Sequence, residues 1–101
     1  MQLLTKELRK RLPALGSTEH MPDPKAQVKF FTPWSNWTWY GVEFDGKDTF
    51  FGLVQGFEEE LGYFSLEEIA SARGPCGLRI ERDITFEPTR LSEVRQERRS
   101  A

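Results

Sequence analysis

The chain has 101 residues, of which 30% are charged and 38% are hydrophobic, and its net charge is −2. This composition is typical of one globular domain, and no apolar run approaches the roughly 18 residues that a membrane helix needs. The N-terminus lacks the apolar stretch of a signal peptide, so we expect a cytoplasmic protein without membrane contact. Basic ends (+3 over residues 1–12 and +2 over 71–101) flank an acidic middle (−7 over 41–70), unlike the continuous basic stripe of a duplex-DNA binder.

The first predicted element is a short amphipathic helix near the N-terminus. Leucines recur there every three or four residues, at Leu4, Leu8, Leu12 and Leu15. This spacing places them on one helix face, with Thr5 as the expected N-cap and Pro13 as the residue that ends the helix. Residues 16–25 are rich in turn formers and predict a loop.

Three strands are predicted next, over residues 26–32, 36–44 and 49–55. Asp45-Gly46 is a hairpin turn signal between the second and third of them. We favour a four-residue turn over a two-residue one, because the shorter turn would place Glu43 directly opposite Asp48.

Aromatic residues are concentrated in this region, since twelve of the thirteen lie between Phe30 and Phe64. Because side chains alternate along a strand, one face of the hairpin is expected to carry Tyr40, Val42, Phe44, Phe51 and Leu53. The other face is expected to carry Trp37, Trp39, Gly41, Glu43, Phe50, Gly52 and Val54. Both faces are apolar, so we expect the hairpin to be central and covered on both sides, with aromatic rings lying over glycine backbone.

The rest of the chain predicts short elements. Residues 58–62 are expected to form an acidic connector or a single helical turn, and the Ser65–Glu68 capping-box spacing begins a helix near 66–73. A short strand over 82–87 and a weak C-terminal helix over 91–98 follow. The fold class is therefore α+β, a small antiparallel sheet around the 36–55 hairpin with helices near both ends. We expect one domain over residues 1–101, with a disordered tail from about residue 96 to 101.

The aromatic run supplies the candidate binding site. Trp37 and Trp39 form either an exposed platform for a partner or part of the core, and Trp34 lies at a predicted turn. The expected binding residues are Trp34, Asn36, Trp37, Trp39, Phe50 and Tyr63. A protein partner is the first expectation, and a homodimer through the second sheet face is an alternative.

Two further alternatives remain open. Single-stranded nucleic acid is the second candidate partner, with phosphate contacts from Lys6, Arg9, Lys10 and Arg11. A small metal-dependent enzyme is the third reading. It would use the carboxylates of Glu43, Asp45, Asp48, Glu58, Glu59, Glu60, Glu81 and Asp83. Solvated surface charge explains these carboxylates more simply. No phosphate loop, dinucleotide fingerprint or zinc spacing is present, so no cofactor, metal site or catalytic residue is predicted.

Several strings of residues resemble a known family. The longest are Ser35-Asn36-Trp37-Thr38-Trp39-Tyr40 and Glu60-Leu61-Gly62-Tyr63-Phe64-Ser65-Leu66, and shorter ones span nearly the whole chain. On these residues the chain resembles the bacterial domain-of-unknown-function family numbered 2958. The resemblance implies a setting on plasmids and other mobile elements and assigns no catalytic residue. Trp34 and Arg79 depart from the acidic residue and the proline usual in that family.

Overall fold

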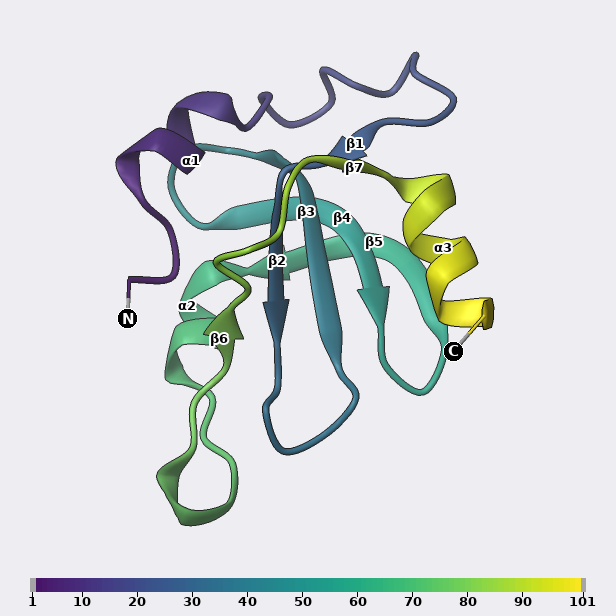
Figure 1. The fold of residues 1–101 in the computed structure, drawn as a ribbon. Helices are drawn as coiled ribbons and strands as arrows, with labels where there is room; N and C mark the ends of the chain where they lie inside the picture. Colours follow the sequence, from purple (N-terminus) through teal and green to yellow (C-terminus); the bar gives the residue numbers. More distant parts are fainter. Residues whose placement is uncertain (1, 101) are drawn as a thin grey trace.

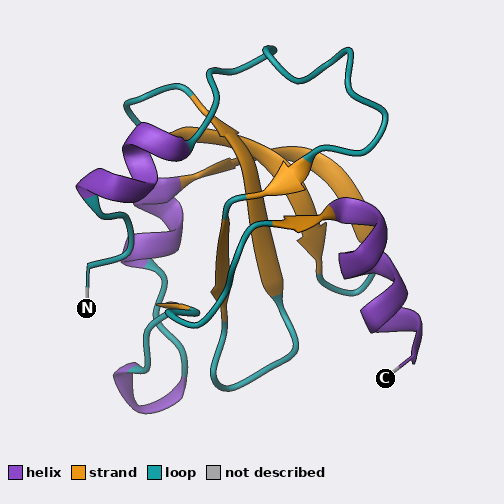
Figure 2. Cartoon of the chain, turned by 45° about the horizontal axis from the view of Figure 1, so that its top comes forward, coloured by secondary structure: helices purple, strands orange, loops and turns teal. Residues whose placement is uncertain are grey.

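The computed structural model describes residues 2–100 and has an α+β fold (Figures 1 and 2). Met1 and Ala101, the latter belonging to the tail expected to be disordered, lie outside the described residues. The elements in chain order are α1 (Lys6–Arg11), β1 (Lys25–Ala26), β2 (Val28–Phe31), β3 (Thr38–Phe44), β4 (Thr49–Gln55), β5 (Glu59–Ser65), α2 (Leu66–Ser71), the 3-10 turn η1 (Pro75–Gly77), β6 (Glu81–Arg82), β7 (Thr89–Arg90) and α3 (Leu91–Ser100). Five strands form an antiparallel sheet of order β5-β4-β3-β2-β6, and β1 pairs with β7 in a two-stranded sheet.

The helix α1 begins where the sequence predicts. The Thr5 side chain accepts a hydrogen bond from the Leu8 amide, 3.2 Å away, which satisfies one of the free amides of the first turn. The helix ends at Arg11, before Pro13. Of the four predicted leucines, Leu8 lies within α1, Leu4 and Leu12 flank it and are buried, and Leu15 is exposed. The leucines therefore do not form one stripe along the helix.

The central hairpin matches the predicted turn length. β3 ends at Phe44 and β4 begins at Thr49, which leaves a four-residue turn. The Asp45 carboxylate accepts the amides of Lys47, Asp48 and Thr49 at 2.8, 2.8 and 3.0 Å. Gly46 adopts a φ of 86°, a backbone conformation that glycine adopts without a steric penalty.

A β-bulge in β3 changes which of its side chains share a face of the sheet, so part of that prediction is wrong. Gly41 pairs with Gly52, but the next pair joins Glu43 to Phe51, so Val42 is an extra residue. One extra residue shifts the alternation of side chains that follow it. Phe44 therefore packs on Phe50, with ring centroids 4.5 Å apart, and Glu43 lies on the opposite face beside Phe51. The predictions for Phe44 and Glu43 are wrong for this reason.

The acidic segment after β4 is a strand, and the predicted connector or helical turn is wrong. β5 pairs with β4 over seven residues without a bulge. Its first residue is held by side chains, because the Glu59 carboxylate accepts from Gln55 Nε2 at 2.8 Å and lies 3.2 Å from Arg95 Nε. β5 forms one edge of the sheet.

The remaining boundaries differ modestly from the predictions. The Ser65 hydroxyl caps α2 by accepting from the Glu68 amide at 3.2 Å, and α2 ends at Ser71, two residues before the predicted end. The predicted strand over 26–32 is divided between β1 and β2, because β1 pairs with β7 instead of β3. The predicted strand over 82–87 is only β6, since a turn begins at Asp83. α3 continues to Ser100.

Two apolar clusters lie on opposite faces of the five-stranded sheet. One contains Leu4, Leu12, Val28, Phe30, Phe44, Phe50, Ile69 and Ile80, under α1 and α2. The other contains Ala26, Tyr40, Val42, Leu53, Leu91 and Val94, under α3 and the two-stranded sheet. Figure 2 shows α1 and α2 on one side of the strands and α3 on the other. The expected cover on both faces is confirmed.

Candidate aromatic binding site

An aromatic cleft lies where the β2–β3 turn, the β4–β5 turn and the segment after α2 meet. It has a volume of about 800 Å³. Its lining residues are Thr32, Trp34, Ser35, Asn36, Trp37, Trp39, Gly56, Phe57, Ala72, Ile80 and Arg98. We call this set the aromatic cleft. It contains all three tryptophans of the chain.

Trp37 is the central ring of the aromatic cleft. Its ring centroid lies 5.9 Å from that of Trp39 and 5.6 Å from that of Phe57. A Cβ atom at Gly56 would lie 2.5 Å from the Trp37 indole, so this ring rests directly on glycine backbone. Phe57 is 93% exposed, whereas Trp37 is half-buried.

Trp34 and Trp39 join the aromatic cleft to the core. Both are half-buried and pack against the cluster under α1 and α2. The Trp34 indole lies on Gly74, because a Cβ atom there would approach it to 2.4 Å. Trp34 and Trp39 are therefore partly core residues and partly an exposed platform. One side of each ring system is packed, and the rings also line a surface cleft.

The β2–β3 turn is held by Thr32, which is buried. The Thr32 amide donates to the Trp37 carbonyl at 3.0 Å, and the Trp37 amide donates to Thr32 Oγ1 at 3.2 Å. The Ser35 amide donates to the Thr32 carbonyl at 3.3 Å, and the hydroxyls of Thr32 and Ser35 share a further hydrogen bond. These contacts fix the backbone from which Trp34 and Trp37 project.

Arg98 closes one side of the aromatic cleft from α3. Its Nη2 atom donates to the Gly56 carbonyl at 2.8 Å. This bond ties the end of α3 to the β4–β5 turn that carries Phe57. A guanidinium that already donates to the chain has less capacity for an external phosphate, although Arg98 retains other N–H groups.

Four of the six predicted binding residues line the aromatic cleft, namely Trp34, Asn36, Trp37 and Trp39. Phe50 does not line the cleft, because it is fully buried between Phe30 and Phe64. The prediction that Phe50 is a binding residue on the surface is therefore wrong. Tyr63 is 70% exposed but packs beside Phe51 on β5, with ring centroids 5.2 Å apart. It is not among the residues that line the cleft.

Seven residues that line the cleft were not predicted from the sequence: Thr32, Ser35, Gly56, Phe57, Ala72, Ile80 and Arg98. Gly74, beneath Trp34, was not predicted either. Phe57 carried a signal, because an aromatic residue between glycine and three glutamates has no predicted core to enter. No sequence signal marked Gly56 and Gly74, because their role depends on which ring lies above them. Arg98 reaches the site only because α3 packs beside the β4–β5 turn.

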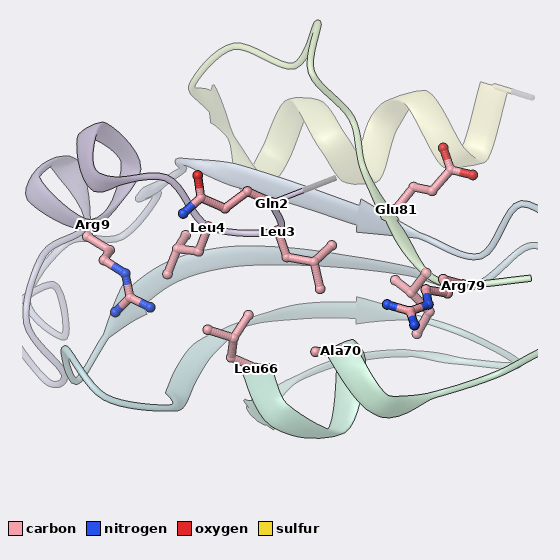
Figure 3. Close-up of a pocket in the computed structure, with 9 residues that line it drawn as sticks. Gln2, Leu3, Leu4, Arg9, Leu66, Ala70, Arg79 and Glu81 are labelled. Atoms are coloured by element: carbon pink, nitrogen blue, oxygen red, sulfur yellow. The ribbon is translucent and has the colours of Figure 1, made fainter.

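The basic residues proposed for phosphate contacts lie elsewhere. Lys6, Arg9, Lys10 and Arg11 are exposed on α1, at the end of the sheet opposite the β2–β3 turn (Figure 1). The Arg9 guanidinium carbon lies 5.5 Å from the centroid of the Phe44 ring. Arg9 and Arg79 lie at the two ends of a separate hollow of about 360 Å³, above apolar residues that include Leu66 and Ala70 (Figure 3).

The acidic residues do not gather into one site. Among residues 2–100, no group of three or more histidine, cysteine, aspartate or glutamate side chains is placed to hold a metal ion. Several of the carboxylates have structural partners. Glu43 binds the 16–18 loop, Asp48 binds Ser65 and Glu67, and a hydrogen bond from Thr85 lowers the pKa of Asp83.

None of the helices formed by the described residues has the length and apolar character needed to span a bilayer. The fold and the site define a small α+β domain with an exposed aromatic cleft. The chain belongs to the family described as "Protein of unknown function (DUF2958)", whose sequence profile matches residues 3–100. No curated protein and no solved structure matches the chain.

Proposed function

We propose that this chain is a non-enzymatic accessory protein that binds another protein through the aromatic cleft. The observation that carries this proposal is Phe57, an aromatic side chain that is 93% exposed and packs edge-on against a half-buried tryptophan. Exposed aromatic clusters of this kind mark binding surfaces in soluble proteins. Tryptophan is also enriched among the residues that dominate binding free energy.

The aromatic cleft is preorganised, which supports a binding role. The Trp37 ring is fixed by Gly56 beneath it and by the Thr32 hydrogen bonds at its backbone. A ring that is already fixed loses little rotamer entropy when a partner binds. The preorganised rings therefore favour binding by reducing this entropic cost.

The biological setting follows from family resemblance. Relatives in this family are bacterial and are often encoded on plasmids and integrative elements, so we place this protein in the cytoplasm of a cell that carries such an element. Its partner is then a product of the element or of the host.

The protein partner is favoured over nucleic acid by the placement of charge. The four basic residues of α1 and the aromatic cleft lie at opposite ends of the sheet. Binding of single strands combines stacking with a basic groove along the backbone. Among the residues that line the cleft, Arg98 is the one basic side chain, and it donates to Gly56.

Site-specific photo-crosslinking tests the proposal. Benzoylphenylalanine in place of Phe57 is irradiated in a lysate of the source cells, and crosslinked species are identified by mass spectrometry. The control carries the same group in place of Ile84, which is 72% exposed and lies outside the cleft. We expect a defined protein crosslink at position 57 that is lost in the Trp37→Ala background and is reproduced with the purified partner.

Three results would overturn the proposal. One is an equal crosslink at positions 57 and 84. Another is a crosslink at 57 that persists with Trp37→Ala. The third is a crosslink only to nucleic acid or to a second copy of this chain.

A further inference from the structure

We infer that the segment bound in the aromatic cleft is proline-rich and extended, in the polyproline II conformation. This inference rests on the proposed function and specifies the chemistry of the partner. It follows from three features of the cleft: its hydrogen-bond donors, the spacing of its rings and the charge around it.

The polar edge of the aromatic cleft presents unused donors. The indole N–H groups of Trp34, Trp37 and Trp39 have no hydrogen-bond partner in the part of the chain that the structure describes, and none of them is shut off from solvent. The Asn36 side chain is exposed and also has no partner there. Tryptophan N–H groups acquire a partner when they are buried, so an occupant that buries these groups must supply acceptors.

A proline-rich segment has the matching pattern. Proline has a carbonyl acceptor and no backbone N–H, and a polyproline II chain forms no internal hydrogen bonds. Its carbonyls are thus available to the indole groups, and its prolines leave no amide donor to be buried unpaired. A strand or helix of mixed sequence would bring amide N–H groups or already-bonded carbonyls to a cleft whose own free groups are mainly donors.

The spacing of the rings fits the same conformation. The centroid of Trp37 is 5.9 Å from that of Trp39 and 5.6 Å from that of Phe57. A polyproline II chain advances about 3.1 Å per residue, hence roughly 6 Å over two residues. Because such a chain has three residues per turn, prolines two positions apart face different sides of it, and the Trp37 and Phe57 rings, whose planes meet at 82°, can each contact one. Aromatic-lined grooves are an established means of binding this conformation.

The charge around the cleft argues against a charged occupant. The four residues that supply rings, Trp34, Trp37, Trp39 and Phe57, are uncharged, and the lining contains no carboxylate and a single arginine that donates to Gly56. Affinity for a neutral apolar segment depends little on salt, whereas affinity for nucleic acid falls steeply with salt. Salt dependence therefore distinguishes the two ligands.

The test titrates the full chain with acetylated decaproline and follows tryptophan fluorescence. A Gly-Ser decapeptide and the oligonucleotide dT10 are the comparison probes. We expect saturable binding of decaproline, no binding of the Gly-Ser peptide, and less than a twofold change in affinity between 50 and 300 mM salt, a range over which phosphate-mediated binding weakens strongly.

Matched variants localise the binding. Gly56→Ala places a methyl group against the Trp37 indole, whereas Gly62→Ala, in the same β-hairpin, places one in open space. We expect Gly56→Ala to weaken decaproline binding at least tenfold and Gly62→Ala to leave it unchanged, with both variants folded by circular dichroism. Trp37→Phe retains an aromatic ring but removes the donor, and is expected to weaken binding by about three- to tenfold, the value of one neutral hydrogen bond.

The outcomes separate this inference from the proposed function. If decaproline fails to bind while the cleft-dependent protein crosslink is present, the chemistry of the segment is wrong and the binding function stands. If dT10 binds in place of decaproline and no protein crosslink forms, both are wrong. Equal effects of Gly56→Ala and Gly62→Ala would place the peptide outside the aromatic cleft and overturn the inference.

Discussion

At the scale of single residues, Glu43 is the one buried carboxylate among residues 2–100. It is 3% exposed and accepts from the Gly16 amide at 2.7 Å, from the Thr18 amide at 2.9 Å and from the Thr18 hydroxyl. Burial by itself would raise the pKa of Glu43, but these hydrogen bonds outweigh burial and hold the pKa below its ordinary value of 4.5. Glu43 thereby attaches the 16–18 loop to β3.

The lowered pKa gives a pH-dependent stability with a defined sign. Folding favours the ionised form of Glu43, so its contribution is present above pH 4.5 and is lost as the pH falls through the lowered pKa. We expect Glu43→Gln to lower the free energy of unfolding by about 2 kcal/mol at pH 7, the value of hydrogen bonds to a charged group. Urea unfolding at pH 7 and at acid pH measures the loss.

The control for this variant is Glu60→Gln, at an exposed position on β5, for which we expect no measurable change at pH 7. The difference between the wild type and Glu43→Gln should shrink in acid as the wild-type carboxylate takes up a proton. An undiminished difference at low pH would mean that side-chain shape, and not charge, holds the loop.

At the scale of elements, the β3–β4 turn positions the start of α2. The Asp48 carboxylate accepts from the Ser65 hydroxyl at 2.6 Å and from the Glu67 amide at 2.8 Å, and the Leu66 amide donates to the Asp48 carbonyl at 2.8 Å. A six-residue helix has little stability of its own. The contacts of Asp48 and the burial of Ile69 therefore stabilise α2 in place.

We expect Asp48→Ala to lower the free energy of unfolding by about 1–2 kcal/mol, because it removes a cap and a charged hydrogen bond. The Glu67 amide should exchange with solvent faster, because it loses the Asp48 carboxylate as its acceptor. Hydrogen exchange measured by NMR detects this change, with the exposed Glu67→Ala as control. Unchanged exchange at the Glu67 amide would contradict the role given to Asp48.

Elements specified by neighbouring residues could be predicted from the sequence. Thr5 and Ser65 cap helices through residues three positions away, and Asp45-Gly46 forms its turn through residues two to four positions away. The bulge at Val42 and the strand β5 could not be predicted, because both depend on pairing with β4. Three consecutive glutamates have a weak strand preference, and pairing overrides it.

The residues of the candidate site fall into the same two groups: those that neighbouring residues specify and those that only the tertiary fold specifies. Trp34, Asn36, Trp37 and Trp39 are close in the sequence, and the prediction of one binding surface formed by a turn at Trp34 and a strand from Asn36 needed only strand alternation and a turn signal. Phe50 was wrongly predicted to be a surface residue, because the alternation along a strand identifies the face that a side chain occupies but not how deeply other elements bury it. Gly56, Gly74 and Arg98 are 19 to 42 residues away from the ring or carbonyl that they contact, so only the tertiary fold assigns them a role.

At the scale of the whole molecule, the five-stranded sheet is the layer shared by two apolar clusters. Phe50 belongs to the cluster beside α1 and α2, and Leu53, three residues along the same strand, belongs to the cluster beside α3. We expect a substitution that destabilises one cluster to destabilise the other as well, because both clusters include residues of β4. Small domains of this size commonly unfold in a single transition.

We expect Leu53→Ala to destabilise the protein by about 2–5 kcal/mol, as for other fully buried leucines. The urea midpoint of tryptophan fluorescence, which reports the aromatic cleft on the other side of the sheet, should fall by the same amount as the midpoint of circular dichroism. A fluorescence midpoint that stays in place would mean that the two clusters unfold independently.

The unpaired side of β5 has a consequence for how the protein behaves in concentrated solution. Seven residues with exposed Leu61 and Tyr63 form a sheet edge, and such edges recruit strands from neighbouring molecules. Glu58 and Glu60 place exposed carboxylates at or beside this edge, and charged side chains at a sheet edge disfavour such pairing. Salt screens exposed charges, so we expect light scattering to rise more steeply with protein concentration at high salt than at low salt. Tyr63→Lys, which replaces an exposed ring on the edge with a charged side chain, should reduce the rise, and equal scattering by this variant would rule out assembly through β5.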